Sequence, residues 1–196
     1  MTTRVILGIS GASGAALALD CARLLARMGI ATDLVITRMA RHTCDLELGP
    51  AATQELEGLA TTHHDGANMG ATIASGSYPV AGMIVAPCSM RSLAAIASGL
   101  DDTLLTRAAG VQLKERRPLV LLAREAPLTL AHLRNMTAVT EMGGIILPPV
   151  PAFYLRPDSM QAITAQIAAR AIDLLRLTPP QARAWRGAGQ PDSRTA

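Results

Sequence analysis

A loop rich in glycine and serine, with the sequence GISGASGA at residues 8–15, is the first place in the chain where chemistry can be expected. An apolar run precedes it and an Ala- and Leu-rich stretch follows, which predicts a strand, a tight loop and a helix in succession. Backbone N–H groups, the hydroxyls of Ser10 and Ser13 and a helix N-terminus together suit the binding of a phosphate group. The hydroxyls of Thr37 and Ser89, which follow later apolar runs, could add further donors.

The spacing of the glycines distinguishes between classes of phosphate ligand. Gly8, Gly11 and Gly14 follow the pattern G-x-x-G-x-x-G, whereas dinucleotide sites have G-x-G-x-x-G. The next predicted strand ends at Thr37 and Arg38, without the carboxylate that binds a ribose. No G-x-x-x-x-G-K-[ST] sequence occurs, which excludes an ATP P-loop. A mononucleotide such as FMN fits best; the alternative is that the small residues only let the strand and the helix pack closely.

Cationic residues indicate a second anion site. Five of them fall within 18 positions of the chain: Arg107, Lys114, Arg116, Arg117 and Arg124. Arg107 and Lys114 share one face of a predicted helix, Arg124 follows a predicted strand, and Arg170 lies on the last predicted helix. Arginine can bind a phosphate through two hydrogen bonds, and lysine adds a point charge. For any single one of these residues, solvated surface charge is the alternative interpretation.

Glu125 is a candidate proton acceptor because it lies beside Arg124 at the end of a predicted strand. Neighbouring cations would hold its carboxylate ionised, so that it could act as a base or relay a proton with a hydroxyl such as that of Ser13. A structural salt bridge to a lysine or arginine is an equally good interpretation of the sequence.

The cysteines and histidines give weaker indications of a functional site than the residues above. Cys88 stands at a predicted helix start, where a thiol can become reactive, but a small buried residue is the interpretation we favour. His63 and His64 have no third ligand at a metal spacing, so we expect a polar loop there and no metal site. His132, on an apolar helix face, is expected to be structural.

Composition limits the class of protein. Apolar residues make up 49% of the 196 residues and aromatic residues 2%, which predicts an aliphatic core. The net charge of +3 is too small for a nucleic-acid-binding surface. We expect one domain at residues 1–178 and a tail at 179–196, partly ordered around Trp185. No signal peptide and no apolar run of roughly 18 residues is visible, so a reduced cytoplasmic protein without a membrane span is expected.

The elements that must position these residues alternate between strand and helix. Apolar runs predict five strands, at residues 4–9, 31–37, 80–87, 118–123 and 144–149. Periodic stretches predict helices at residues 14–29, 38–48, 89–99, 101–116, 127–143 and 157–177. Asp101 or Asp102 is expected to cap the fourth helix and Pro127 to lie in the first turn of the fifth; residues 49–78 are ambiguous. This alternation predicts a parallel sheet with helices on both faces and ligands at the carboxyl ends of its strands.

The chain resembles the UbiX-like flavin prenyltransferases from residue 4 to about residue 185. The shared sequences are GISGASGA, ASGS, PCS, LLTRAA, LKERRPLVLLAREAPL, HLRNM and GGIILPPVPAFYLRP, with a late tryptophan. The resemblance implies a three-layer Rossmann or flavodoxin-like fold and assembly as a homododecamer. It also implies a metal-independent transfer of a dimethylallyl group from dimethylallyl phosphate to N5 and C6 of reduced FMN, and a UbiD-like decarboxylase that receives the prenylated flavin.

The resemblance also implies roles for individual residues. Those that would bind FMN are Gly11, Ala12, Ser13, Thr37, Ser89, Met90, Arg91, Ser92 and Arg124. Those around the prenyl donor would be Tyr154, Arg170, Arg107, Lys114, Trp185, Ala74, Ser75 and Gly76, with Arg107 and Lys114 supplied across a subunit contact. The catalytic groups would be Ser13, Glu125, Glu47 and Lys114.

Two features depart from the family pattern and two other functions stay open. Ala15 and Ala16 stand where the family often has an aromatic residue, and residues 49–78 match poorly until ASGS. The pocket shape and the choice between a phosphate and a pyrophosphate donor therefore stay open. The other functions are an FMN-dependent cysteine decarboxylase of the same fold and a non-catalytic FMN carrier.

Overall fold

Strands and helices alternate along most of the chain, as the apolar runs predict. The computed structural model describes residues 3–185 and 187, so the expected tail at 179–196 lies partly outside the described residues. The strands are β1 (Arg4–Ile9), β2 (Ala31–Ile36), β3 (Thr62–His64), β4 (Met83–Cys88), β5 (Leu119–Ala123) and β6 (Ile145–Ile146). The helices are α1 (Ala15–Arg27), α2 (Arg38–Leu48), α3 (Ala51–Leu59), α4 (Met90–Ala97), α5 (Leu104–Lys114), α6 (Leu130–Glu141) and α7 (Met160–Asp173). Two short 3-10 turns are η1 (Thr72–Ala74) and η2 (Phe153–Leu155).

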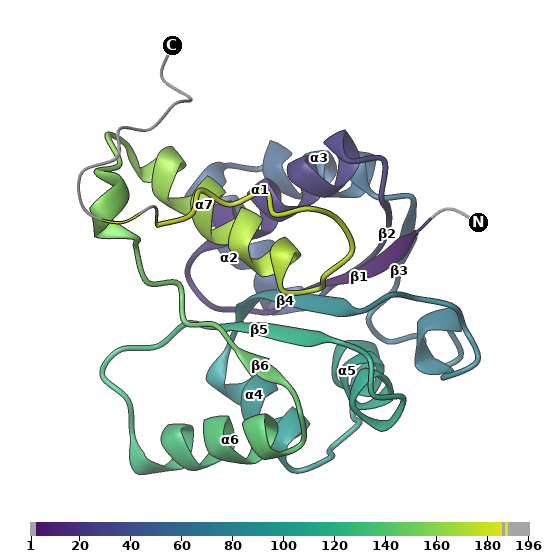
Figure 1. The fold of residues 1–196 in the computed structure, drawn as a ribbon. Helices are drawn as coiled ribbons and strands as arrows, with labels where there is room; N and C mark the ends of the chain where they lie inside the picture. Colours follow the sequence, from purple (N-terminus) through teal and green to yellow (C-terminus); the bar gives the residue numbers. More distant parts are fainter. Residues whose placement is uncertain (1–2, 186, 188–196) are drawn as a thin grey trace.

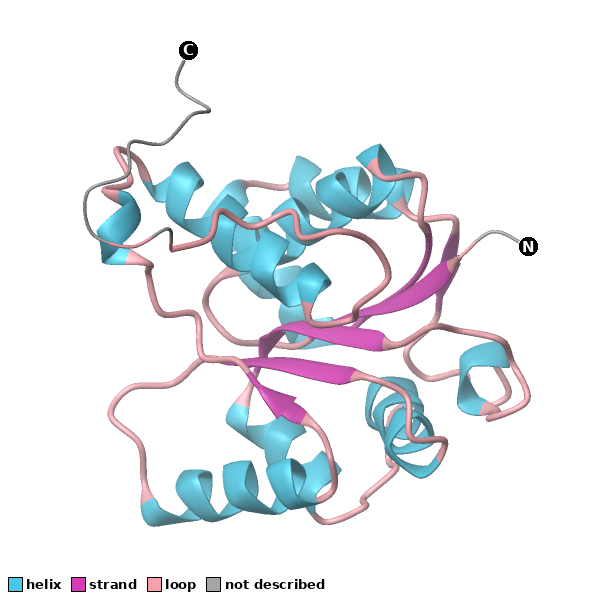
Figure 2. Ribbon diagram, viewed as in Figure 1, coloured by secondary structure: helices cyan, strands magenta, loops and turns pink. Residues whose placement is uncertain are grey.

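The strands form one parallel sheet in the order β3-β2-β1-β4-β5-β6. Helices α1, α2, α3 and α7 cover one face and α4, α5 and α6 cover the other, giving the three predicted layers (Figures 1 and 2). Strand order runs outward in both directions from the pair β1–β4, where Ile6 lies beside Met83 and Gly8 beside Val85. Doubly wound sheets bind their ligands at such a reversal of strand order, beyond the carboxyl ends of the strands.

Burial on both faces explains why β1, β2, β4 and β5 are continuous apolar runs in the sequence. One cluster of buried side chains joins the sheet to α1 and α7, around Leu25, Leu34 and Ile172. The other joins the sheet to α4 and α5, around Leu93 and Leu105. The largest fully buried side chains are isoleucine, leucine and methionine, so the prediction of an aliphatic core is confirmed.

The predicted number of strands is wrong because the ambiguous segment contains a sixth. Strand β3 has the sequence Thr-His-His, which is polar because it is an edge strand that the helical layers leave partly exposed. The expected polar loop at His63 and His64 is therefore a strand. Without β3 the order is that of flavodoxin-like sheets, and with it the order is that of the six-stranded Rossmann sheet. Strands β4 and β6 are also shorter than the predicted ranges at 80–87 and 144–149.

Two predicted helix starts are wrong for the same physical reason. Thr103, rather than Asp101 or Asp102, caps α5: its hydroxyl accepts a hydrogen bond from the Thr106 N–H. Thr129 caps α6 in the same way, so Pro127 lies in the preceding loop. In each case the threonine side chain accepts the N–H of the residue three positions later, and the side chain of that residue accepts the N–H of the threonine. This reciprocal arrangement is a capping box.

A buried carboxylate fixes the edge of the sheet. Asp33 on β2 is fully buried, and its side chain accepts hydrogen bonds from Arg4 at 3.1 Å and from the Tyr78 hydroxyl at 3.3 Å. The Nε2 atom of His64 on β3 lies 2.7 Å from its other oxygen. Asp33 therefore joins β1, β2, β3 and the loop after η1, which explains an acidic residue in the middle of an apolar strand.

We expect Asp33→Asn to lower the free energy of unfolding by about 3 kcal/mol, because it removes one partner of a buried, charged hydrogen-bond network. Chemical denaturation measures this change. Thr32→Val on the same strand is the control: Thr32 is buried but only its hydroxyl contact to the Ile30 carbonyl is lost, which costs less than about 1 kcal/mol. Equal losses in the two variants would contradict the role given to Asp33.

Candidate functional site

The loops that follow β1 and β4 are joined by one buried hydroxyl. Ser10 is 2% exposed; its Oγ donates to the Pro87 carbonyl at 3.0 Å and accepts from the Ser89 N–H at 2.7 Å. Its own N–H also donates to the Pro87 carbonyl, at 3.2 Å. The expectation that Ser10 would offer its hydroxyl to a phosphate is therefore wrong, because that hydroxyl is already used to hold the two loops together.

The glycine loop presents backbone donors at this junction. Gly11 packs against α2 so closely that a Cβ on it would lie 2.5 Å from the Cβ of Met39, so a larger residue would displace the loop. Ala12 donates its N–H to the Ser10 carbonyl at 2.8 Å. Within the described residues, no group accepts a hydrogen bond from the N–H of Gly11 or of Ser13. These two donors fit an anionic group, which is the fit expected for a phosphate.

The N-terminus of α1 is occupied by a carboxylate from α2. Gly14 has a left-handed conformation, with φ of 115°, and no side chain that could cap the helix. Glu47 takes this role: its carboxylate accepts the Gly14 N–H at 2.9 Å and the Ala15 N–H at 2.8 Å. A negative charge at this position is stabilised by the helix dipole. The backbone donors that remain free therefore lie in the loop before the helix and not in its first turn.

Glu47 is held in the ionised form. Partial burial raises the pKa of its carboxyl, but hydrogen bonds from the side chain of Ser13 and from the backbone of Ala15 and Gly14, together with the charge of nearby Arg124, outweigh it and lower the pKa below its ordinary value. Ser13 is thus paired with Glu47. Glu125, expected as the partner of Ser13, is exposed and accepts the Ala126 N–H at 3.1 Å.

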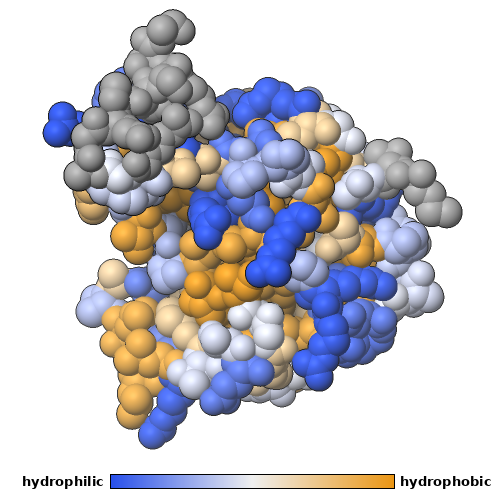
Figure 3. Space-filling view, in the orientation of Figure 1, coloured by the Kyte–Doolittle hydropathy of each residue, from blue (hydrophilic) through white to orange (hydrophobic). Residues whose placement is uncertain are grey.

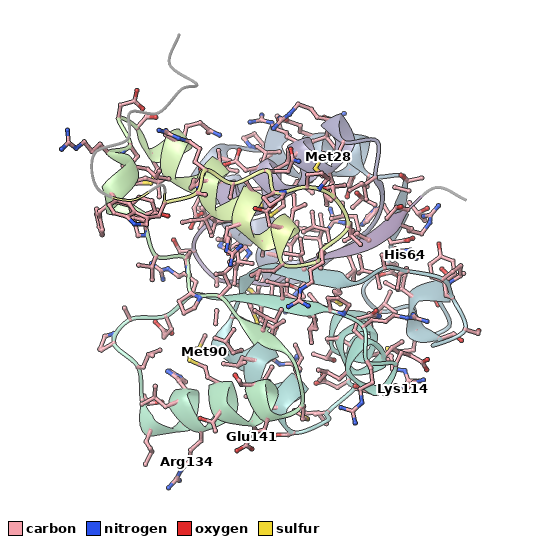
Figure 4. The ribbon with its side chains drawn as sticks, in the orientation of Figure 1. Met28, His64, Met90, Lys114, Arg134 and Glu141 are labelled. Atoms are coloured by element: carbon pink, nitrogen blue, oxygen red, sulfur yellow. The ribbon has the colours of Figure 1, made fainter. Side chains whose placement is uncertain are left out.

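Two helices begin beside the glycine loop with hydroxyl caps. Thr37 follows β2 and accepts the Ala40 N–H at 3.2 Å as the cap of α2, and Ser89 follows β4 and accepts the Ser92 N–H at 3.3 Å as the cap of α4. Met90 begins α4 near the carboxyl edge of the sheet (Figure 4), and Arg91 forms an ion pair with Asp102. A cavity of about 750 Å³ opens beside Thr37, but its other walls come from residues such as Arg41, His63 and Asp102 and not from the glycine loop.

Tyr154, Arg170 and Trp185 come together in a second cavity. This cavity, which we call the donor cavity, measures about 420 Å³ and has apolar walls that include Leu147 and Ile167. The rings of Tyr154 and Trp185 meet edge to face, with centroids 5.2 Å apart. Arg170 has no ion pair and no hydrogen-bond partner for its guanidinium within the described residues. An unpaired guanidinium in an apolar cavity suits a small ligand with an anionic end.

The remaining expected site residues lie elsewhere in the molecule. Lys114, at the end of α5, lies far from Met90 in Figure 4 and pairs with Glu115. Arg107 binds the Ala74 carbonyl at 3.1 Å and pairs with Asp101 at 3.0 Å. The residues of this group, which we call the α5 cluster, are Ala74, Ser75, Gly76, Arg107 and Lys114. One chain therefore does not bring the α5 cluster to the donor cavity.

The other candidates from the sequence are structural. Burial raises the pKa of the Cys88 thiol to about 12, which agrees with a small core residue and not with a nucleophile. His132 accepts the Thr129 N–H through Nδ1 as part of the cap of α6. The described part of the chain contains no group of three or more histidine, cysteine or acidic side chains placed to hold a metal ion. None of its helices combines the length and the apolar character that a membrane span requires.

Comparison with known proteins identifies the family. Residues 1–170 match the family described as Flavoprotein. The flavin prenyltransferase UbiX of Neisseria meningitidis serogroup B is 48% identical over 95% of this chain and 98% of its own length. A crystal structure of AnUbiX in complex with FMN and dimethylallyl pyrophosphate has a TM-score of 0.90 and 42% identity, covering 95% and 99% of the two chains. The chain belongs to the UbiX-like flavin prenyltransferases. This family membership confirms the resemblance inferred from the sequence.

A second UbiX-like structure bears on assembly. The crystal structure of a dodecameric, FMN-dependent UbiX-like decarboxylase from Escherichia coli O157:H7 has a TM-score of 0.90 and 43% identity, covering 94% of this chain and 100% of that one. In our chain, apolar surface gathers around the start of α6 (Figure 3), where Leu128, Leu130 and Leu133 are exposed. Exposed apolar patches of this kind are typical of subunit contacts.

Sequence reasoning missed two residues beside Arg170. Gln166 and Asp173 line the donor cavity and stand four residues before and three residues after Arg170, which places all three on one side of α7. That spacing is visible in the sequence. Without the path of the chain after α7, however, the sequence indicates only that both are polar residues on a solvated helix surface.

We expect Glu47→Gln to lower the free energy of unfolding at pH 7 by about 1 kcal/mol, since an amide lacks the charge that α1 stabilises. Because the folded pKa of Glu47 is lowered, its contribution is complete above the unfolded value of about 4.3 and is lost as pH falls through the folded value. The difference between wild type and variant should therefore shrink in acid.

Chemical denaturation at several pH values measures this effect. Asp45→Asn removes an exposed acid from the same helix and is the control, with an expected change within about 0.5 kcal/mol. A Glu47→Gln effect as small as that of the control, or one that is constant down to pH 3, would contradict the assignment.

Proposed function

We propose that this protein transfers a dimethylallyl group from dimethylallyl phosphate to N5 and C6 of reduced FMN. The observation that carries the proposal is the presence of two sets of free donors that suit anions: the N–H groups of Gly11 and Ser13 in the glycine loop, and the guanidinium of Arg170 at the donor cavity. Family membership supports it, and so does the UbiX-like neighbour that was crystallised with FMN and a dimethylallyl ester.

FMN fits the chemistry of the residues around the glycine loop. The free N–H groups of Gly11 and Ser13 suit its phosphate, and Ala12 lies between them. The proposed remaining contacts come from Thr37 and from the segment Ser89, Met90, Arg91 and Ser92, with Arg124 beside Glu47. Reduced FMN supplies the electron-rich N5 and C6 atoms that accept the five-carbon group.

The donor cavity suits the departure of phosphate from an allylic carbon. Breaking the C–O bond leaves both bonding electrons on the phosphate, and the guanidinium of Arg170 stabilises that charge without having to leave another partner. The Tyr154 hydroxyl is proposed as a second donor to the same phosphate. The apolar walls and the indole of Trp185 keep water from the electron-poor allyl group.

Closure of the new ring bonds C6 to the tertiary carbon of the five-carbon unit: the neighbouring alkene carbon takes up a proton and C6 then releases one, so the step needs both a proton donor and an acceptor. Glu47 is ionised at neutral pH and already hydrogen-bonded to Ser13, so Ser13 can pass a proton to it. We propose the pair Ser13–Glu47 for this step, with Glu125 and the departing phosphate as further acceptors near the carboxyl edge.

The α5 cluster is proposed to complete the site of a second copy of the chain. In one chain Arg107 lies near the start of α5, paired with Asp101, and Lys114 ends the helix, paired with Glu115, whereas both cations are expected beside the donor phosphate. The dodecameric UbiX-like neighbour supports a homo-oligomer, and we propose that its subunits share sites. The product is proposed to pass to a UbiD-like decarboxylase.

Mass spectrometry of the flavin tests the reaction. After anaerobic incubation of the protein with reduced FMN and dimethylallyl phosphate, we expect the flavin to gain one five-carbon unit. Dimethylallyl pyrophosphate in a parallel reaction determines the preferred donor. Arg170→Ala should lower the rate by about a hundredfold, as expected for the loss of one fixed stabiliser of developing charge. If only unmodified FMN is recovered, the protein is a flavin carrier and not a prenyltransferase.

Mixed oligomers test the sharing of sites. Arg170→Ala and Lys114→Ala should each retain only about a hundredth of the wild-type rate, because each lacks one cation. When the two variants are co-expressed with different tags and purified as mixed oligomers, about a quarter of the sites should combine two intact contributions and regain activity. Activity that stays at the level of the single variants would show that both cations are needed from the same chain.

A further inference from the structure

The segment after α7 runs back along the helix that it has just left. Figure 1 shows this segment, residues 178–185, lying across α7; we call it the tail. Its first residues include Pro179 and Pro180, which restrict the backbone, and Ala182 is buried. The tail has no regular secondary structure of its own, so its position depends on what holds it to α7.

Asp173 provides the first attachment. Its carboxylate accepts the backbone N–H of Gln181 at 2.6 Å and that of Ala182 at 3.0 Å. A carboxylate in the last turn of a helix is disfavoured by the helix dipole. Two backbone donors from the tail compensate this unfavourable position, so the acidic residue at the end of α7 is explained by the tail.

Gln166 provides the second attachment, two turns earlier on the same side of α7. Its Nε2 donates to the Arg183 carbonyl at 2.9 Å, and its Oε1 accepts the Arg183 N–H at 3.0 Å. One side-chain amide thus pairs with both backbone groups of one tail residue, much as a neighbouring strand would. Together the two attachments fix the backbone from residue 181 to residue 183.

The attached tail forms one wall of the donor cavity. Pro180, Ala182, Ala184 and Trp185 all line it, together with Tyr154 and Arg170. Gln166 and Arg183 also line a second cavity of about 500 Å³. The hydrogen-bonded pair of Gln166 and Arg183 therefore contributes to the walls of both cavities.

The same attachments keep Arg170 available. Asp173 lies three residues after Arg170, a spacing at which oppositely charged side chains on a helix can pair. No such ion pair is found within the described residues, where the Asp173 carboxylate is turned to the tail. The guanidinium remains without a carboxylate partner and faces the cavity.

We propose that Gln166 and Asp173 are positioning residues that fasten the tail to α7, so that Trp185 stays against Tyr154 in the wall of the donor cavity and Arg170 stays free for the donor phosphate. This inference rests on the proposed function for the identity of the ligand. The attachment itself is a property of the protein without substrate.

The single tryptophan of the chain, Trp185, reports directly on the attachment. In the double variant Gln166→Ala/Asp173→Asn, time-resolved fluorescence anisotropy of the full-length protein should show an increase of about twofold in the amplitude of nanosecond motion of the indole, the timescale of loose segments. Gln181→Ala is the matched control, because it changes a tail side chain and keeps the backbone N–H that binds Asp173. Its anisotropy decay should equal that of the wild type.

Calorimetry with dimethylallyl phosphate, on protein loaded with oxidised FMN so that no transfer occurs, gives the second measurement. The dissociation constant should rise about tenfold in the double variant, as expected for the loss of hydrogen bonds of ordinary net strength, and stay unchanged in the control. The dissociation constant of FMN should be the same in all three proteins.

Two results would overturn the inference: equal indole motion in the wild type and the double variant, or greater motion with unchanged donor affinity. Failure of the proposed function gives a different result, since wild-type protein would then not bind dimethylallyl phosphate at all while the anisotropy still reports on the tail.

Discussion

The buried hydroxyl of Ser10 joins the two loops from which the flavin site is built. The loops after β1 and β4 come from strands that are neighbours in the sheet but 77 residues apart in the sequence at this contact. Ser10 binds the Pro87 carbonyl and the Ser89 N–H, and Ser89 in turn caps α4. The glycine loop on one side and the segment from Ser89 to Ser92 on the other can bind one ligand only while this contact holds.

Two negatively charged groups can be held side by side at that junction. The carboxylate of Glu47, from α2, lies at the N-terminus of α1 and is held ionised there, while the loop before α1 leaves two N–H groups for an anion. A phosphate and the carboxylate of Glu47 therefore do not compete for the same donors. Arg124 offsets part of the negative charge that gathers there. This arrangement places a proton acceptor beside Ser13, close to where the flavin is proposed to bind.

The sequence predicted those features that local patterns determine. Apolar runs that are buried on both faces revealed β1, β2 and β5, and the glycine loop with its following helix was visible from residues 4 to 29. The edge strand β3 could not be predicted, because its polar Thr-His-His sequence depends on pairing with β2 and on the buried carboxylate of Asp33. The caps at Thr103 and Thr129 were missed because neighbouring aspartates and a proline carry equally good local signals.

The sequence could indicate which types of residue belong to the candidate site, but not how these residues are arranged. Residue types pointed to Ser13 and Arg170 and the family resemblance added Tyr154, but the role of Ser10 depends on a contact across the sheet, and the roles of Gln166 and Asp173 depend on the path of the tail. The α5 cluster shows a further limit, since its place beside a donor phosphate is proposed to require a second copy of the chain. Contacts between distant segments and between subunits leave no pattern in a single sequence.

The most direct measurement is the dissociation constant of FMN for Ser10→Ala. Ser10 is nearly inaccessible and cannot touch the ligand, yet the loss of its two hydrogen bonds should separate the loops and weaken FMN binding by about tenfold, with the overall fold retained by circular dichroism. Wild-type affinity for FMN in Ser10→Ala would contradict the claim that this hydroxyl holds the flavin site together.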